Sequence, residues 1–565
     1  MRRSPVCRPV FGRSSDRTIG SPGPRSRATR RIGTLPVAFR DFSPIRALAL
    51  LMRLPRRLPR AAIAAVLGTM LIAAICPTAL AARSQRSIFQ DDNQLIFQPR
   101  AEVARALDEL RYLGVDVVRV SVFWNLVAPA PDSRARPSFD AGEPAAYPAV
   151  NWERYDQLVA LAQQRGIDVD FNLTPPAPLW ASGSTDNEGF AGHFRPSATE
   201  FAQFVRAVGK RYAGGYVADG RTLPRISFWS LWNEPNGPHF LSPQWDRSGG
   251  RAFEASAKIY RSLVDAGFSA LAQTGHGGDT ILIGETAPKG VLGVGAGRSL
   301  RPLRFIRALY CVDQRLRPLR GSAAGVQGCP RSNQASAFPA AHPALFRATG
   351  WGHHPYQLLL APQVRSQVDS VSTADIPSLT GTLDGAFNAY RQRRRIPIYF
   401  DEYGYETNPP AAFGVSLGQQ ATYINQAEYM AYRNPRVRTY SQFLLRDYPA
   451  SDLFQSGLIA ENGAAKPALA AYRAPIYLPA TRSRTLRFQV WGLLRPGARA
   501  GVRTATVQFR PRGAGAFAGV ATVATGPRGY VERTVRLSGA GDVRLAFGDP
   551  ATGQQVFTRS IFVRR

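Results

Sequence analysis

Lysine and cysteine are scarce in this chain of 565 residues. Each occurs four times, so 67 arginines supply almost all of the basic charge. Four cysteines in a chain of this length exclude a small disulfide-dense scaffold and a zinc protein built on many cysteines. Acidic residues are also few, 39 against 71 basic residues, which gives a formal net charge of +32. A hydrophobic fraction of 44% excludes a chain that is disordered throughout.

The N-terminal part of the chain has the pattern of an export signal rather than of a fold. Residues 1–51 are rich in Arg, Pro, Gly and Ser without periodicity, and we interpret them as a disordered or misannotated N-terminal extension. Residues 52–82 combine an arginine cluster, an uncharged apolar run and small residues at a cleavage site, which is typical of a signal peptide. An uncleaved membrane anchor is the alternative. We therefore expect a secreted, extracellular protein, with no stable membrane span once the signal is cleaved.

Two cysteines remain after the expected signal peptide, Cys311 and Cys329. An even pair of cysteines in a protein bound for an oxidising compartment predicts a disulfide between them. The alternative is a pair of free buried thiols.

Strands and helices alternate through most of the chain. Apolar runs of strand length occur at 115–124, 167–173, 226–231, 280–283, 348–351, 396–400 and 438–445. Helical spacing of apolar residues occurs at 102–113, 155–165, 198–212, 253–272, 379–394, 419–432 and 467–472. With the short apolar run Asn93–Phe97 counted first, about eight strand–helix units result, which predicts an α/β fold, a (β/α)8 TIM barrel over residues 83–475. A doubly wound open sheet is disfavoured because no glycine-rich phosphate turn follows the first strand.

Residues 476–565 have a different pattern. Short alternating runs such as LRFQVWGLL, VRTATVQFR and YVERTVRLS are separated by Gly, Pro and Asp turns. This pattern is typical of a small antiparallel β-sandwich, so we expect a C-terminal accessory domain of that kind.

Two glutamates stand where predicted strands break into loops. Glu234 follows the fourth strand and Glu402 follows the seventh. In an eight-stranded barrel, catalytic groups lie at the carboxyl ends of the strands, so these two side chains can face each other across the mouth. Glycoside hydrolysis needs two such carboxyl groups, one protonated and one ionised. Glu285 ends the fifth strand and is the main competing carboxylate, which we expect to bind a sugar hydroxyl.

The residues around both glutamates resemble clan A of the retaining glycoside hydrolases, with family 39 and family 5-like members the most similar. The resemblance rests on Asn233-Glu234-Pro235 and Glu402-Tyr403-Gly404. Further landmarks are Arg119 at the end of the second strand, Trp351 to Tyr356 (WGHHPY), and Pro178-Leu179-Trp180. The likeness covers about residues 90–475. It implies a secreted enzyme that cleaves O-glycosidic bonds of a polysaccharide or glycoconjugate by double displacement.

The resemblance also implies roles for single residues. Glu234 would be the general acid/base and Glu402 the nucleophile, with retention of anomeric configuration and the two carboxyl groups ~5–5.5 Å apart. Asn233 would hydrogen-bond the 2-hydroxyl of the sugar. Arg119 would keep Glu402 ionised.

Other residues of the resemblance would form the walls of the sugar subsite. Tyr356 would hydrogen-bond Glu402, and His354 would line the same subsite. Trp180 and Trp124 stand near strand ends, where we expect them to stack on sugar rings. Adjacent histidines point apart on a strand, so His353-His354 predicts no metal site, and we expect no cofactor. Asp401, directly before the nucleophile, departs from many relatives, which have a neutral residue there.

Alternatives from other functional classes remain. One is a non-catalytic carbohydrate-binding wall protein, and another is a transglycosylase that uses the same carboxylates. Nucleic acid is not an expected partner, because the sequence has no recognisable nucleic-acid module. The charge supports this view, since residues 1–81 carry +13, residues 476–565 carry +12 and the barrel only +7. We expect the basic C-terminal region to hold the enzyme on an anionic cell-envelope polymer.

Overall fold

The computed structural model describes residues 82, 84–332, 334–448, 454–496 and 501–565. The expected N-terminal extension and, apart from Ala82, the expected signal peptide lie outside the described residues. Among the helices of the described segments, none combines the length and hydrophobicity that are needed to cross a bilayer.

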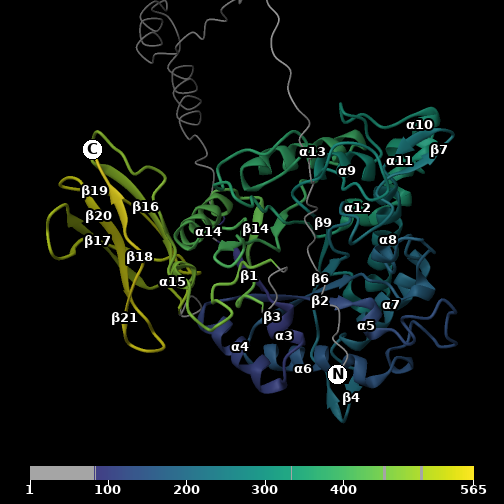
Figure 1. The fold of residues 1–565 in the computed structure, drawn as a ribbon, viewed down its shortest axis with the longest axis horizontal. Helices are drawn as coiled ribbons and strands as arrows, with labels where there is room; N and C mark the ends of the chain where they lie inside the picture. Colours follow the sequence, from purple (N-terminus) through teal and green to yellow (C-terminus); the bar gives the residue numbers. More distant parts are fainter. Residues whose placement is uncertain (1–81, 83, 333, 449–453, 497–500) are drawn as a thin grey trace, which may run out of the picture. The chain divides into compact units, whose positions relative to one another are not determined.

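Eight parallel strands form a closed barrel (Figure 1). In order around the barrel they are β1 (Arg86–Gln90), β2 (Val117–Phe123), β3 (Asp168–Thr174), β6 (Phe228–Leu231), β9 (Thr280–Thr286), β10 (Gly350–His353), β11 (Ile398–Phe400) and β14 (Val437–Phe443). The barrel closes where β1 pairs in parallel with both β2 and β14. Spatial order therefore follows chain order, and the predicted (β/α)8 barrel is confirmed.

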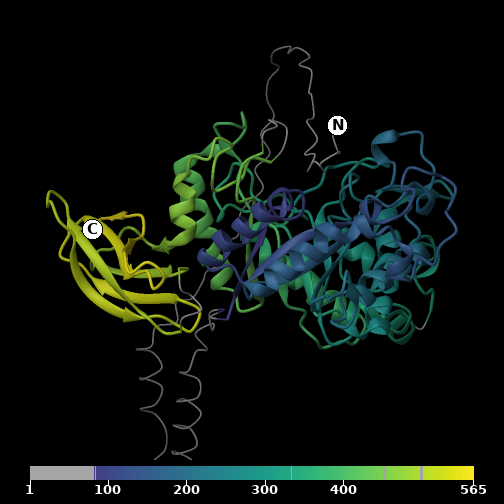
Figure 2. The same cartoon turned by 90° about the horizontal axis from the view of Figure 1, so that it is seen from below.

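Helices connect the strands and surround the barrel (Figure 2). They are α3 (Asp92–Ile96), α4 (Arg100–Tyr112), α5 (Trp124–Val127), α6 (Ala149–Gln164), α7 (Ala198–Arg211), α8 (Ala255–Leu271), α9 (Pro302–Leu309), α10 (Gly321–Val326), α11 (Gln334–Ala341), α12 (Pro343–Arg347), α13 (Ile376–Ala389), α14 (Leu417–Tyr432) and α15 (Pro467–Arg473). Helix α7 shows the local logic, because the Ser197 side chain caps it by accepting from the Glu200 amide. Its Phe201, Phe204 and Val208 recur at helical spacing and are buried.

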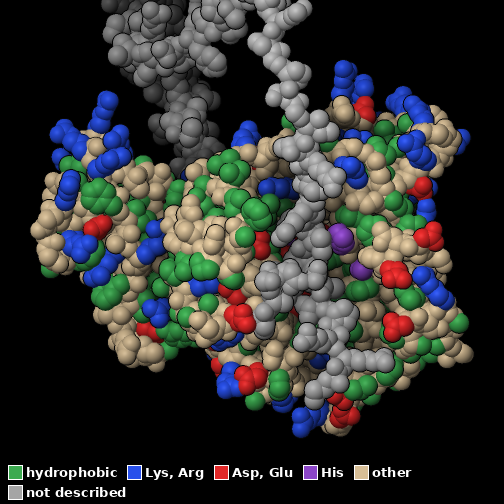
Figure 3. Space-filling model, viewed as in Figure 1, with side chains coloured by type: hydrophobic (Ala, Val, Ile, Leu, Met, Phe, Trp, Pro, Cys, Tyr) green, Lys and Arg blue, Asp and Glu red, His purple; other side chains and the backbone are tan. Residues whose placement is uncertain are grey.

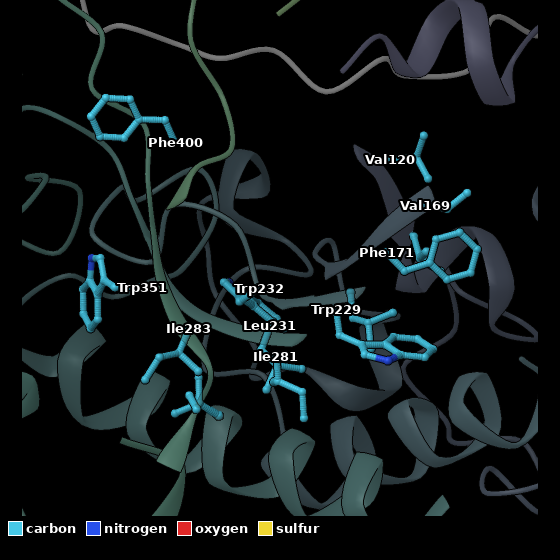
Figure 4. Packing of buried hydrophobic residues seen from close by; sticks show 14 of the residues in the cluster. Val120, Val169, Phe171, Trp229, Leu231, Trp232, Ile281, Ile283, Trp351 and Phe400 are labelled. Atoms are coloured by element: carbon cyan, nitrogen blue, oxygen red, sulfur yellow. The ribbon is translucent and has the colours of Figure 1, made fainter. Parts of the chain in front are cut away.

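Alternation along the barrel strands separates an apolar outer face from a partly polar interior. Val118, Val120 and Val122 of β2 belong to the main hydrophobic cluster between strands and helices. Other labelled members of this cluster in Figure 4 are Phe171, Trp229, Leu231, Trp232, Ile281, Ile283, Trp351 and Phe400.

Inside the barrel, one apolar layer lies below a layer of polar side chains. The apolar layer consists of Ile88, Val117, Phe228 and Leu282, with Tyr399 packed against them. Two residues further along their strands, Arg119 and Ser230 are buried at inward positions. The barrel therefore places buried charges directly beneath its mouth.

The C-terminal residues form two antiparallel sheets. The first contains β15 (Ile476–Tyr477), β16 (Arg487–Leu493) and β19 (Tyr530–Arg536), and the second contains β17 (Thr504–Pro511), β18 (Ala518–Ala524), β20 (Gly541–Gly548), β21 (Gln555–Phe557) and β22 (Ile561–Val563). One hydrophobic cluster includes Phe488 of the first sheet and Val507 and Leu545 of the second. The predicted antiparallel strands are confirmed, and the sandwich arrangement stays a prediction.

Short two-stranded sheets occupy three of the loops. They pair β4 (Val217–Ala218) with β5 (Arg221–Thr222), β7 (Asp246–Ser248) with β8 (Arg251–Phe253), and β12 (Thr407–Asn408) with β13 (Val415–Ser416). Cys311 and Cys329 form the predicted disulfide between the turn after α9 and the loop after α10.

Two details of the strand prediction were wrong. The first barrel strand is Arg86–Gln90, whereas most of the run Asn93–Phe97 belongs to helix α3. That helix begins there because the Asp91 side chain accepts from the Gln94 amide and caps it. Arg119 lies inside β2 rather than at its end.

Candidate active site

Asn233 and Glu234 follow β6, the fourth strand of the barrel. Trp232 has φ 74° and Glu234 has φ 38°, in the left-handed region that residues other than glycine rarely adopt. Backbone strain of this kind persists where surrounding contacts fix it, often at functional sites. Here the Glu234 amide donates to the Glu285 carbonyl at 2.9 Å, which ties the end of β6 to β9. This anchored bend positions the Glu234 carboxyl.

Glu402 follows β11, the seventh strand, and faces Glu234. Its Oε1 accepts a hydrogen bond from the Tyr356 hydroxyl at 2.8 Å, and its Oε2 lies 3.3 Å from Nη1 of Arg119. One oxygen of Glu234, one nitrogen of His354 and one oxygen of Glu402 all lie within 4.8 Å of one another. The Glu234 and Glu402 side chains are 14% and 11% exposed. The structure thus brings together the two glutamates that the strand ends predicted.

Arg119 joins the residues of the site from below and is fully buried. Its Nη1 also donates to Gln90 Oε1, and its Nη2 donates to Asn233 Oδ1 at 2.9 Å and to Glu285 Oε2 at 2.8 Å. Burial lowers the pKa of Arg119, but the surrounding carboxylates raise it by more, so the guanidinium stays charged. Because Arg119 occupies the Asn233 oxygen, the amide nitrogen of Asn233 is the group left to donate to a sugar hydroxyl.

Glu234 and His354 share a short contact of 2.8 Å between Oε1 and Nδ1. Burial raises the pKa of the Glu234 carboxyl; the His354 contact opposes this, and the net shift is upward. Burial lowers the pKa of His354, but nearby carboxylates, Glu402 foremost, raise it well above 6.5. A proton is therefore retained between these two groups above the pH at which a solvent-exposed carboxyl would lose it. A general acid needs this property.

A second carboxyl pair lies beneath the first. Glu285 and Asp401 are fully buried, and a Cβ atom on Gly352 would overlap both Glu285 Oε1 and Asp401 Oδ2. These two oxygens therefore face the same small space, which only glycine leaves open. Among the described residues, neither oxygen has a donor as partner. A single proton shared between these two oxygens would give the Glu285 oxygen a donor and complete the hydrogen bonding of the pair.

The two members of this lower pair differ in protonation. Burial raises the pKa of Glu285, but Arg119 and other neighbours lower it further, to about 2. Burial and the Glu285 charge raise the pKa of Asp401 well above 3.8. Asp401 therefore carries the proton and donates it to ionised Glu285. Nε2 of His354 lies 3.6 Å from an oxygen of each, so the imidazole separates the lower pair from Glu234.

A cavity of about 250 Å³ lies beside Glu402 at the carboxyl ends of the strands. Its lining comes mainly from the segments that follow β1, β2, β3 and β14, together with Asn233 and Glu402. Neither Glu234 nor His354 lines it. The cavity is thus on the Glu402 side of the carboxyl pair.

Two predicted substrate contacts need correction. Trp124 is fully buried and packs on Phe204 with 5.5 Å between ring centroids, so it is a core residue. Glu285 is buried below the site and pairs with Arg119 rather than with a substrate. Trp180 is partly buried and its Nε1 donates to the Pro129 carbonyl at 3.0 Å, and its contact with the substrate stays a prediction.

The two adjacent histidines do point apart. His353 Nδ1 contacts the Thr286 hydroxyl at 2.9 Å and Nε2 contacts the Val371 carbonyl at 3.1 Å, whereas His354 faces Glu234. Burial lowers the pKa of His353 to about 3, so it is neutral. The absence of a metal and of a cofactor stays a prediction.

Several cavity residues were missed from the sequence. They include Gln90, Asp92, Phe97, Ser121, His193, Phe240, Tyr448 and Phe454. Gln90 is the last residue of β1 and Asp92 follows that strand, and polar residues at a strand end are a signal that the sequence offers. The signal was missed because the first strand was assigned to Asn93–Phe97. Aromatic residues on long loops give no comparable signal, because loops bring them to the cavity only in the folded chain.

Comparisons with known proteins give structural matches at low identity. No protein-family model matches the chain, and no curated protein sequence matches it. A family 39 glycoside hydrolase from Bacteroides cellulosilyticus WH2 is 12% identical, with 81% of this chain and 80% of that one covered and a TM-score of 0.41. A glucosidase from Croceicoccus marinus is 13% identical, with 86% and 82% covered and a TM-score of 0.43. An endo-beta-1,4-mannanase from Thermotoga petrophila is 13% identical, with 85% and 97% covered and a TM-score of 0.36.

Proposed function

We propose that this protein is a retaining glycoside hydrolase, with Glu234 as general acid/base and Glu402 as nucleophile. The observation that carries the proposal is a pair of carboxyl groups, with oxygens within 4.8 Å of each other, at the ends of two barrel strands. A separation of ~5–5.5 Å suits attack by one carboxylate on the sugar, whereas inversion needs ~6.5–9.5 Å to admit a water.

The surroundings of the two glutamates support opposite roles. Glu234 has an upward pKa shift from burial, which favours the protonated form that a leaving oxygen needs. Glu402 instead accepts from Tyr356 and Arg119, two donors that orient a carboxylate for attack. Both donors also exclude other orientations of the nucleophile.

In the proposed reaction, Glu402 attacks the anomeric carbon while Glu234 gives its proton to the leaving oxygen. The glycosyl–enzyme ester then reacts with a water from which Glu234, now ionised, removes a proton. The sugar leaves with its original anomeric configuration, and both glutamates return to their starting states. The Asn233 amide would donate to the 2-hydroxyl, a hydrogen bond that strengthens in the transition state.

The direct test is hydrolysis of a panel of aryl glycosides and polysaccharides, with the first anomer formed identified by NMR. We expect the product to have the configuration of the substrate. Glu234→Gln should lower kcat/KM by about 10²- to 10⁴-fold for poor leaving groups and much less for dinitrophenyl leaving groups. Glu153→Gln on the exposed face of α6 is the matched control. An inverted product, or equal losses for all leaving groups, would contradict the assignment.

For residues 476–565 we propose a β-sandwich that holds the secreted enzyme on an anionic cell-envelope polymer. Arginine side chains gather at one end of these sheets (Figure 3). Arg487 and Arg536 are directly opposite each other on β16 and β19 and both are exposed, an unfavourable pairing unless an anion lies between them. The double variant Arg487→Ala/Arg536→Ala should sediment less with envelopes at low salt, and unchanged sedimentation would contradict the idea.

A further inference from the structure

The cavity beside Glu402 has a charge opposite to that of the protein. The chain as a whole carries +32, yet the charged side chains among the described lining residues are Asp92 and Glu402, both acidic. The lining histidine, His193, has its pKa lowered by burial to about 4 and is neutral. Arg119 lies below the lining and is paired with Glu285 and Glu402. The charged groups that a ligand meets on the wall of this cavity are therefore acidic.

Asp91 and Asp92 follow β1 as neighbours but have different functions. Asp91 is buried and accepts hydrogen bonds from the amides of Gln94 at 3.1 Å and Leu445 at 2.9 Å. Both of its carboxylate oxygens are therefore bonded to backbone amides. It caps α3 and joins β1 to the segment after β14. Asp92 is half-buried and lines the cavity. Burial raises the pKa of its carboxyl; hydrogen bonds from Ser121 and the charge of Arg119 oppose this, and the net shift is upward.

Asp92 is held in one orientation without losing its exposure to the cavity. It is the first residue of α3, and its Oδ1 accepts from the Ser121 amide on β2 at 2.9 Å. A fixed, half-buried carboxylate can accept hydrogen bonds from sugar hydroxyls, and charge-assisted bonds of this kind are the stronger ones. A carboxylate on the sugar would instead be placed near both Asp92 and Glu402.

The rest of the lining fits one sugar ring. The volume of about 250 Å³ is below the ~300–1,000 Å³ of pockets for drug-sized ligands. Neutral polar groups on the wall are Gln90, Asn93, Ser121, Asn125, Thr174 and Asn233. Aromatic rings are Phe97, Phe123, Phe240, Phe443, Tyr448 and Phe454, which can contact the apolar faces of a sugar.

We propose that Asp92 binds hydroxyl groups of the sugar that reacts with Glu402, and that this subsite selects an uncharged sugar unit over a uronic acid. Only one part of this proposal rests on the proposed hydrolase function, namely that the bound sugar reacts with Glu402. Recognition of an uncharged ring by Asp92 follows from the geometry and charge of the cavity.

The test uses pairs of 4-nitrophenyl glycosides that differ only at C6: glucoside with glucuronide, and galactoside with galacturonide, with a xyloside as the form without C6. We expect kcat/KM for the best uncharged sugar to exceed that for any uronide by at least about 100-fold. Asp92→Ala should lower kcat/KM for the uncharged sugar by about 10- to 100-fold, the loss typical of a hydrogen bond to a charged group. Asp92→Asn should also lower the ratio of kcat/KM for the uncharged sugar to kcat/KM for the uronide by about tenfold. Asp186→Asn is the same change on an exposed loop. It should alter neither kcat/KM for the uncharged sugar nor the ratio between uncharged sugar and uronide.

A purely structural role of Asp92 would lower activity on both members of a pair equally and leave the ratio unchanged, which would overturn the proposal. Calorimetric titration of the Glu234→Gln protein with the methyl glycosides separates binding from hydrolysis. Selective binding of the uncharged sugar that is lost in Glu234→Gln/Asp92→Ala supports the subsite even if the wild type hydrolyses nothing. Two results would reject the proposed subsite. One is hydrolysis by the wild type together with equal binding of the uncharged sugar and the uronide to Glu234→Gln, and the other is no binding of any glycoside.

Discussion

Two carboxyl pairs lie one above the other in the same barrel. The upper pair, Glu234 and Glu402, keeps some exposure, and Glu402 lines the cavity at the carboxyl ends of the strands. The lower pair, Glu285 and Asp401, is fully buried and closed on itself above Gly352. Both pairs come from the ends of strands, and both contact Arg119 or His354. The difference teaches that access, rather than residue type, distinguishes the carboxyl pair that we propose to be catalytic from the buried pair below it.

Loss of the nucleophile should give the largest effect on activity. Glu402→Gln should lower kcat/KM by at least about 10⁴-fold, because an amide cannot replace a carboxylate as the nucleophile that forms the glycosyl ester. The free energy of unfolding should change by less than about 1 kcal/mol, since the amide oxygen still accepts from Arg119 or Tyr356. Steady-state kinetics and urea unfolding measure the two quantities. Residual turnover above about 1% of the wild-type value would show that a residue other than Glu402 is the nucleophile.

The lower pair should show the reverse pattern, with stability as the main loss. Glu285→Gln removes the buried partner of Arg119, which lies 2.8 Å away with both side chains inaccessible. Breaking such a pair leaves a buried charge less compensated and typically costs about 3–5 kcal/mol. Urea unfolding at pH 7 should show this loss. A variant as stable as the wild type would show that Arg119 is compensated by Glu402 alone.

His354 connects the two pairs, and its removal should change the pH profile. The contact with His354 lowers the pKa of Glu234, so His354→Gln should raise that pKa further. A general acid acts in its protonated form, and activity is lost as pH rises through its pKa. The alkaline limb of kcat/KM should therefore move to higher pH in the variant. A limb that moves to lower pH would show that His354, rather than Glu234, carries the catalytic proton.

The sequence was sufficient for the upper pair because both glutamates follow buried apolar strands, which strand periodicity reveals. Asp92 was missed since Arg86–Gln90 is a short, partly polar strand just before the more apolar run Asn93–Phe97. Trp124 was assigned to the substrate on its position near a strand end, and only the packing of Phe204 against it shows that it is core. The shared proton of Glu285 and Asp401 depends on residues 116 positions apart and on a glycine between them in space. No local pattern encodes that contact.

Replacement of Asp401 by an isosteric amide should have the smallest effect. The pKa of Asp401 is raised in the folded protein, so the associated stability is complete below the unfolded value of 3.8 and is lost as pH rises through the folded pKa. Asparagine does not titrate, and its amide can donate to Glu285 as the protonated carboxyl does. Asp401→Asn should therefore keep activity within about threefold, and its stability relative to the wild type should improve as the pH rises above about 4, the unfolded pKa. Asp401→Ala is the control: it leaves a buried Glu285 oxygen without a donor and should cost about 1–3 kcal/mol at pH 7. If asparagine is as harmful as alanine, Asp401 is ionised in the fold, and the lower pair does not share a proton.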